Sequence, residues 1–278
     1  MGILTAKKIA EFYEAYARVG VTFTADMIQA TGLIPEHVHI KCGSDFWPCV
    51  FMAASFQGAK VLANAKKGLL KKLAATKNSA SLRLSFKNPE DRGNPVTFFM
   101  PCRVGDCSPY KGSGEVSVLS VRFTQRPPDD FIEIMGRVLD AKANSSKPGG
   151  ERILVNADSG RRLRLYSRET VVFIQKVPRR CILRDLSFSG AKVVLMGVGK
   201  FLADKEVALR VEFEEPRESF LLPGRIAALG DVEGKQEMVA LSIAYDKQRI
   251  PSAYKVRIND YSNIVRADGR AQSDWAER

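Results

Sequence analysis

The segment RRCILRDLSFSGAKVVLMG (residues 179–197) contains two apolar runs separated by a short polar turn. Apolar runs of this length, rich in branched residues and bounded by turn residues, predict two β-strands. The turn places a carboxylate, Asp185, next to the hydroxyls of Ser187 and Ser189. Gly190 follows them, and a glycine at this point allows a ligand or another backbone to approach closely. The segment therefore predicts a strand pair whose turn presents polar side chains.

Further strand signals surround this pair. Their spacing of roughly 10 to 15 residues is typical of a small antiparallel barrel or sandwich. The tail from Tyr254 predicts a helix that ends frayed. The other strand-like segments are ETVVFIQ (169–175), KEVALRVEF (205–213), SFLLPGRIAAL (219–229) and EMVALSIAYD (237–246).

The first half of the chain has a similar strand content. Helical spacing of apolar residues predicts helices at 5–19, 58–78 and 126–143, and strands are predicted at 81–86, 95–102 and 115–123. NSSKPGG (144–150) is the most linker-like stretch of the chain. We predict a mainly β protein with a few helices, formed by two small antiparallel β-barrels joined by a helix and a linker. The expected domains are 1–143 and 144–262, with a frayed tail at 263–278.

Composition limits the function classes. The 278 residues are 45% hydrophobic and 27% charged, as in an ordinary globular protein. No apolar run approaches the length of a membrane span, and charges occupy the first 20 residues where a signal peptide needs its apolar core. The five cysteines are scattered and no export signal is found, so reduced thiols in the cytoplasm are expected. We also expect a monomer. The formal net charge of +12 points to an anionic partner.

The positive charge is concentrated near the predicted turn. Residues 152–184 contain nine basic side chains against only Asp158 and Glu169. Eight of the nine are arginine, which suits bidentate recognition of phosphate or of a guanine edge. Asp185 beside them can accept hydrogen bonds from the N1–H and N2–H₂ groups of guanine. The pattern therefore favours an anionic guanine nucleotide as ligand. The nine are Arg152, Arg161, Arg162, Arg164, Arg168, Lys176, Arg179, Arg180 and Arg184.

The segment RDLSFSGAKV (184–193) resembles the D/N-x-S-x-x-G motif of PilZ domains, with Asp185, Ser187 and Gly190 at the three specified positions. PPDDFIEIMG and AYKVRINDY further resemble the spirochaete-type PilZ proteins, in which an N-terminal PilZ-like barrel precedes the ligand-binding one. The resemblance implies a non-enzymatic receptor for the second messenger cyclic di-GMP, with no cofactor. It also implies a role in motility or virulence signalling, with a motility or regulatory protein as partner.

The second PilZ motif, R-x-x-x-R before the barrel, is incomplete here. Arg152 stands at its second arginine, but Pro148 stands four residues earlier, with Lys147 beside it. Arg164 and Arg168 form a literal match further along and are the reserve candidates.

By this resemblance, Arg152 and its neighbours grip phosphate and stack on guanine, Asp185 and Ser187 read the guanine edge, and Gly190 leaves room for the purine. Ligand binding would order residues 144–152 and change the angle between the domains.

Other functions have less support. A nucleic-acid-binding protein with two small barrels is the alternative, favoured by the net charge and the lysine-rich segment 58–78. The sequence contains no P-loop, G-x-G-x-x-G or G-x-S-x-G motif, so an enzyme is not expected. His37, His39, Cys42 and Cys49 are the only cluster with metal-ligand chemistry, but their spacing is better explained by structural roles, and no metal is expected.

Overall fold

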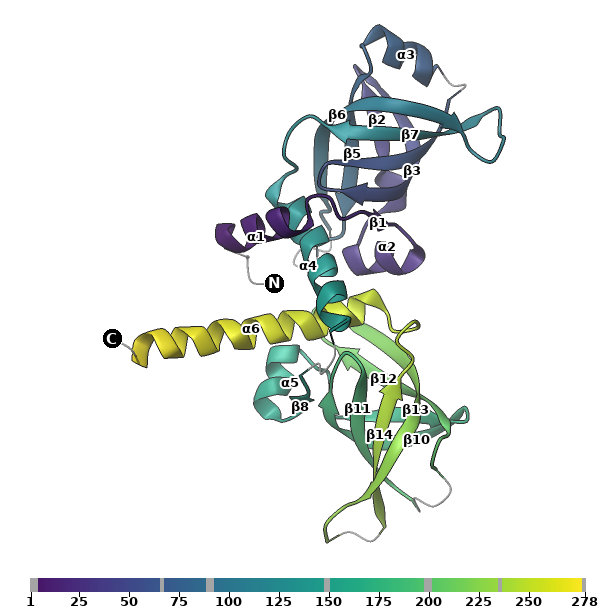
Figure 1. The fold of residues 1–278 in the computed structure, drawn as a ribbon. Helices are drawn as coiled ribbons and strands as arrows, with labels where there is room; N and C mark the ends of the chain where they lie inside the picture. The colour runs from purple at the N-terminus through teal and green to yellow at the C-terminus, as the bar shows by residue number, and fades with distance from the viewer. Residues whose placement is uncertain are drawn as a thin grey trace. The chain divides into compact units, whose positions relative to one another are not determined.

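The computed structural model describes residues 5–65, 68–88, 93–147, 151–197, 202–234 and 237–276, with side chains described as far as Asp268. Its contacts divide the chain into two compact units, Met1–Leu139 and Asp140–Arg278. Each unit is built around one antiparallel barrel (Figure 1).

The first barrel has the strand order β1-β3-β2-β5-β6-β7-β4 and is closed by pairing of β3 with β4. Helix α3 lies at one end of this barrel, and α1 and α2 lie at the other (Figure 1). The elements are α1 (Ala6–Tyr16), β1 (Val21–Thr22), α2 (Ala25–Thr31), the 3-10 helix η1 (Pro35–His37), β2 (His39–Cys42), β3 (Asp45–Ser55), β4 (Gly58–Asn64), α3 (Leu69–Ala75), β5 (Ser79–Phe86), β6 (Val96–Pro109) and β7 (Val116–Phe123).

Phe131 is the centre of the aromatic core in the first unit. It lies on α4 (Asp129–Ser145) and is fully buried. Its ring lies within 6.4 Å, centroid to centroid, of four other phenylalanine rings. The start of α4 therefore closes the open end of the barrel with an aromatic plug. The four rings belong to Phe56, Phe86, Phe98 and Phe123.

The second barrel has the order β11-β14-β13-β12-β9-β10-β8 and is closed by pairing of β10 with β11. Tyr254 on α6 is fully buried and packs near the rings of Phe213, Phe220 and Tyr245. The elements are β8 (Ile153–Leu154), α5 (Ala157–Leu163), β9 (Glu169–Ile174), β10 (Val177–Leu186), β11 (Gly190–Met196), β12 (Glu206–Phe213), β13 (Glu218–Asp231), β14 (Met238–Tyr245) and α6 (Ser252–Ala276).

The two barrels have the same topology, strand for strand. Reading the second order backwards gives β8-β10-β9-β12-β13-β14-β11, which matches the first when β1 corresponds to β8 and β7 to β14. The sequences around the closing strands also match: AASFQGAKVL (53–62) corresponds to DLSFSGAKVV (185–194), and VTFTAD (21–26) to ILVNAD (153–158). We infer that the chain contains an internal duplication.

The predicted mainly β fold with two antiparallel barrels is confirmed. The predicted helix at 58–78 is wrong. Gly58–Asn64 forms strand β4, which pairs with both β3 and β7, and only Leu69–Ala75 is helical. Alanine and lysine suit a helix, but two strand partners and alternating burial in β4 override that propensity. The lysine-rich helix that favoured nucleic-acid binding is thus only seven residues long.

Helix α6 extends further than the sequence suggested. Its backbone is helical from Ser252 to Ala276, where a frayed tail was expected from residue 263. No proline interrupts this segment, and most of its residues are compatible with a helix. Among the described residues, no helix is both long and apolar enough to span a membrane.

Candidate nucleotide-binding site

Asp185 is held almost out of solvent near the end of β10. Its backbone pairs with Lys192 of β11 on one side and with Leu154 of β8 on the other. The register of β10 against β11 shifts between Leu183 and Asp185, as in a β-bulge, which can re-aim a side chain. The Asp185 side chain is only 8% exposed. A buried carboxylate needs a partner, because the loss of its hydration without a compensating ion pair or hydrogen bond costs several kcal/mol.

That partner is Arg152, which directly precedes β8. Its Nη1 donates to Asp185 Oδ1 at 2.6 Å, while 47% of the arginine side chain remains exposed. Pairing of β8 with β10 brings the two residues together although they are 33 positions apart. The pair therefore combines a fixed, buried acceptor with a partly exposed cation that can exchange partners without unfolding the strand.

Ser187 organises the turn that follows. Its Oγ accepts hydrogen bonds from the backbone N–H groups of Ser189 and Gly190 and donates to the Gly190 carbonyl oxygen. The residue is 1% exposed, and its own carbonyl accepts a hydrogen bond from Tyr254 Oη at 2.9 Å. The serine hydroxyl thus fixes the shape of the turn next to Asp185.

The close approach of strands β11 and β14 requires a glycine at position 190. A Cβ at this position would lie 2.2 Å from the Ile243 carbonyl oxygen of β14, which is closer than real contacts allow. The structure therefore gives a reason for this glycine that differs from the expected room for a purine: β11 and β14 could not pair this closely with any other residue there.

Two phenols lie close to the turn and remain protonated at neutral pH. Burial raises the pKa of Tyr254, and the negative charge of Asp185 raises it further. Burial also raises the pKa of Tyr245, with a contribution from Tyr254. Tyr254 can therefore keep donating to Ser187 over the whole physiological range.

Comparisons with known proteins identify the family of the chain. Residues 7–142 match the model of the PilZN3 domain. A protein of Treponema denticola described as a cyclic di-GMP binding protein is 35% identical over 267 residues, which are 96% of this chain and 85% of that protein. The chain belongs to the two-domain PilZ family.

Solved structures are similar to the chain at lower identity. The Borreliella burgdorferi PlzA protein in complex with c-di-GMP matches with a TM-score of 0.42 and 23% identity, covering 93% of this chain and 99% of that one. The Bacillus subtilis inhibitor of motility, MotI/DgrA, matches with a TM-score of 0.34 and 12% identity, over 85% of this chain and 99% of that one.

The candidates for the incomplete second PilZ motif occupy different places. Lys147 is exposed, and its Nζ donates to Asn144 Oδ1 at 2.7 Å; Pro148 lies outside the described residues. The Arg164 guanidinium is held by Glu215, through both its carbonyl and its carboxylate. Arg168 is exposed, and its carbonyl accepts from the Leu183 amide, two residues before Asp185. The structure thus brings Arg152 to Asp185 and gives Arg164 another partner.

Three of the other basic residues of 152–184 have partners or positions away from the Asp185 carboxylate. Arg162 pairs with Asp158 and with Asp268 of α6. Arg179 and Arg180 lie on β10 toward its other end and are exposed. These arginines are part of the solvated surface of the barrel.

The corresponding site in the first barrel is the feature that the sequence analysis missed. The internal repeat aligns Ala53 with Asp185, Ser55 with Ser187 and Gly58 with Gly190. A self-comparison of the sequence would have found it, since six of the ten residues in AASFQGAKVL recur in DLSFSGAKVV. The first barrel thus keeps the turn but lacks the carboxylate.

The histidine and cysteine residues are placed as structural side chains. His39 and Cys42 lie on β2 and Cys49 on β3, and both cysteines are buried. Burial raises the pKa of the Cys49 thiol to about 12. In the part of the chain that the structure describes, no group of three or more acidic, histidine or cysteine side chains could hold a metal ion.

Proposed function

We propose that the second barrel is a non-enzymatic receptor for cyclic di-GMP, centred on Arg152 and Asp185. The observation that carries the proposal is their hydrogen bond at 2.6 Å, between a buried carboxylate and a half-exposed guanidinium, next to a D-x-S-x-x-G turn. The 35% identical relative from Treponema denticola, described as a cyclic di-GMP binding protein, supports the same ligand.

The pair suggests how the ligand would be recognised. A guanine base offers two adjacent donors, N1–H and N2–H₂, which a carboxylate can accept together. When guanine takes the place of Arg152 at the fixed Asp185 carboxylate, the half-exposed Arg152 side chain is released to bind phosphate or to stack on the base. Binding would therefore exchange an internal ion pair for two ligand contacts, and the buried carboxylate would keep a partner throughout.

Other residues would complete the site. Ser187 and Gly190 hold the turn and so position Asp185. The Ser187 hydroxyl is buried and bonded within the turn, so Ser187 would act on the ligand through the position of Asp185 and not by direct contact with the base. Lys147 and Arg168 are exposed, so each can supply a second cation for the phosphates. Arg164 is the weakest of the proposed residues, because Glu215 already holds its guanidinium.

Calorimetric titration with cyclic di-GMP tests the proposal. We expect binding to the native chain and a loss of about 10- to 100-fold in affinity for Arg152→Ala and for Asp185→Ala, since each removes a charge-assisted contact of about 1.5–3 kcal/mol. Arg179→Ala is the matched control: it removes an arginine about 20 Å away along the same strand and should leave affinity within about 3-fold. No heat with the native chain would exclude the proposed function, and undiminished binding by both site variants would exclude the site.

We further propose that the ligand changes the geometry between the two barrels by ordering the segment that carries Lys147 and Arg152. A ligand can shift such an equilibrium only through its differential affinity for the two arrangements. Small-angle X-ray scattering with and without cyclic di-GMP should show a change in radius of gyration for the native chain and none for Asp185→Ala. An unchanged curve at saturating ligand would contradict this part of the proposal while leaving binding intact.

A further inference from the structure

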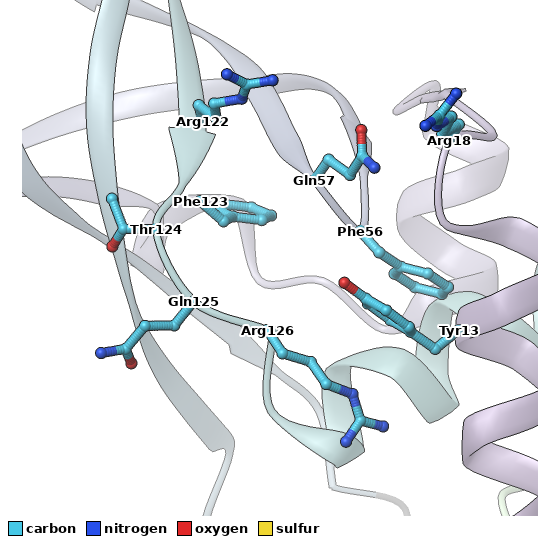
Figure 2. Close-up of a pocket in the computed structure, with 9 residues that line it drawn as sticks. All are labelled: Tyr13, Arg18, Phe56, Gln57, Arg122, Phe123, Thr124, Gln125 and Arg126. Carbon is cyan, nitrogen blue, oxygen red and sulfur yellow. The ribbon is translucent and has the colours of Figure 1, made fainter.

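The first barrel contains a cavity of about 630 Å³ beside its own copy of the turn (Figure 2). A volume of this size is in the range of small-molecule sites, roughly 300–1,000 Å³. Three arginines and three aromatic residues are among the side chains that line it, and none of the nine described lining residues is acidic. The nine are Tyr13, Arg18, Phe56, Gln57, Arg122, Phe123, Thr124, Gln125 and Arg126.

The arginines of this cavity are not neutralised from within. Among the described residues, the side chains of Arg18 and Arg122 have no ion-pair or hydrogen-bond partner. Arg126 forms an exposed ion pair with Asp129 and also lies over the ring of Tyr13. The Arg126 guanidinium carbon is 5.2 Å from the centroid of that ring. Three guanidinium groups around one hollow create a strong preference for an anion.

A neighbouring cation adds to this charge. Arg122 of β7 stands directly opposite Arg103 of β6, and both side chains are exposed. Like charges directly opposite each other on a sheet are destabilising, so the arrangement lowers the stability of the free protein. A bound anion would relieve this repulsion as well as contact Arg122.

The cavity lies at the position that corresponds to the Asp185 site. Phe56 and Gln57 are the middle residues of the first barrel's turn, between Ser55 and Gly58, as Phe188 and Ser189 are in the second. Gly58 pairs with Arg122, whereas its counterpart Gly190 pairs with Ala244. The first barrel therefore has Ala53 where the second has Asp185, and Arg122 where the second has Ala244.

We propose that this cavity binds an organic phosphate carrying a flat ring, of the size of a mononucleotide, without selecting the base. Arg18 and Arg122 would hold the phosphate through paired N–H donors, a geometry that suits arginine better than lysine. Tyr13, which stacks on the buried Phe56 with centroids 5.8 Å apart, is the partly exposed aromatic residue of the lining and would take the ring (Figure 2).

The lack of base selection follows from the available polar groups. The backbone amides of Phe123 and Thr124 already donate to the carbonyls of Gln57 and Pro101. The side-chain amides of Gln57 and Gln125 each carry a donor and an acceptor and can serve either purine, whereas none of the described lining residues is a carboxylate that accepts the two adjacent donors of guanine together, as Asp185 can. We therefore expect AMP and GMP to bind with affinities within about 3-fold of each other. The proposal is independent of cyclic di-GMP binding by the second barrel.

Calorimetry on the full-length chain carrying Asp185→Ala tests this proposal, because that variant impairs the second-barrel site. AMP, GMP, adenosine and inorganic phosphate are titrated separately. We expect both mononucleotides to bind, inorganic phosphate to bind at least about 10-fold more weakly, and adenosine not to bind measurably. Adenosine binding as tight as AMP would overturn the phosphate contact, and a GMP preference above about 10-fold would overturn the lack of base selection.

Substitutions of the arginines that line the cavity test whether AMP binds there. Arg122→Ala and Arg18→Ala should each weaken AMP binding by about 10-fold or more, and Arg122→Lys should recover only part of the loss. The matched control is Lys71→Ala, which removes one exposed charge from α3 at the other end of the same barrel and should leave affinity within about 2-fold (Figure 1). Thermal melts of each variant confirm that it is folded.

The outcomes distinguish nucleotide binding in this cavity from nucleotide binding at the Asp185 site of the second barrel. AMP binding that is lost in Arg152→Ala but kept in Arg122→Ala would overturn the proposal and place the nucleotide in the second barrel. Binding of single-stranded RNA with no binding of mononucleotides would also overturn it, in favour of a nucleic-acid surface. Failure of cyclic di-GMP to bind the native chain would affect only the proposed function of the second barrel.

Discussion

The two barrels share one topology and one turn but differ in the charge placed at that turn. The second barrel has a buried carboxylate held by Arg152, whereas the first has Ala53 at the same position and exposes Arg122 instead. A carboxylate with an arginine can read a specific base edge, while arginines alone recognise an anion. The difference shows how a duplicated fold can keep its backbone geometry and change its ligand chemistry by a few substitutions.

What the barrels keep is equally informative. Gly58 lies against the Val121 carbonyl oxygen, and Gly190 lies against the Ile243 carbonyl oxygen. In both cases an added Cβ atom would be 2.2 Å from that oxygen. Each glycine pairs with a residue of the neighbouring strand, and the next residue of that strand is aromatic: Phe123 in the first barrel and Tyr245 in the second. The backbone amide of this aromatic residue donates a hydrogen bond to a carbonyl of the turn. The glycine and serine of the motif therefore maintain the fold, and only the acidic position is free to specialise.

The largest effect is expected from the shared glycines. Gly190→Ala and Gly58→Ala should each destabilise their own barrel by about 2–3 kcal/mol, because the added methyl group collides with backbone that cannot move without breaking strand pairing. Urea unfolding followed by hydrogen-exchange mass spectrometry assigns the loss to one barrel or the other. Only Gly190→Ala should also reduce binding of cyclic di-GMP.

Gly160→Ala is the control for this experiment. Nothing lies within 4 Å of a Cβ at Gly160 in helix α5, so alanine should be neutral or should stabilise the second barrel by up to about 1 kcal/mol. Equal stability of Gly190→Ala and the native chain would show that the close strand approach is not required.

Much of this comparison could be predicted from local sequence patterns. The strands of 169–246 alternate or are continuously apolar, and each was found in the structure because both strand propensity and pairing favour the same state. The acidic turn at Asp185 was equally visible. The segment 58–64 was misassigned because its alanines and lysines suit a helix, and only the neighbouring strands decide otherwise.

Other features depend on contacts that no local pattern contains. The ion pair of Arg152 with Asp185 spans 33 residues and arises from pairing of the two-residue strand β8, which is too short to show a period. Helices α2 and α5 have only seven residues each, so helical spacing could not be recognised. The cavity lined by Arg18 and Arg122 likewise requires α1 and β7 to be placed together.

The second difference between the barrels appears at high pH. Tyr245 and Tyr254 occupy the places of Phe123 and Phe131, and burial raises both tyrosine pKa values above the value of about 10 expected in the unfolded chain. Above pH 10 the unfolded state therefore loses protons that the folded state keeps, and stability falls as pH rises. Each tyrosine should lower the free energy of unfolding by about 1.4 kcal/mol per pH unit above pH 10. Below pH 10 the stabilising contribution of the two tyrosines is fully present.

Urea unfolding of the second barrel at pH 8 and pH 11 measures this contribution. The variant carrying Tyr245→Phe and Tyr254→Phe should be less stable at pH 8 by about 1–3 kcal/mol, because the Ser187 carbonyl loses its donor, but should lose less stability on going to pH 11. The buried Cys181 thiol, whose pKa burial raises to about 12, is present in both chains and cancels. Parallel pH profiles would contradict the assignment to the tyrosines.

The smallest effect concerns the helix caps that follow β1 and β8. Asn156 Oδ1 accepts from the amides of Asp158 and Ser159, both at 2.9 Å, and Ser159 Oγ accepts from the Asn156 backbone amide, which completes a capping box. Thr24 makes only one longer contact, 3.4 Å to the Met27 amide. Asn156→Ala should therefore cost about 1–2 kcal/mol and Thr24→Ala about 0.5 kcal/mol.

The difference between the caps also bears on ligand binding. Ser159 Oγ donates to the Leu154 carbonyl of β8, the strand that holds Arg152 against Asp185, so weakening the cap loosens that strand. Asn156→Ala should consequently lower affinity for cyclic di-GMP by about 2- to 5-fold, whereas Thr24→Ala leaves it unchanged. Asn156→Ser, which retains a capping oxygen, should restore both stability and affinity. An affinity loss that persists in Asn156→Ser would mean that the asparagine acts on the site by some route other than the cap.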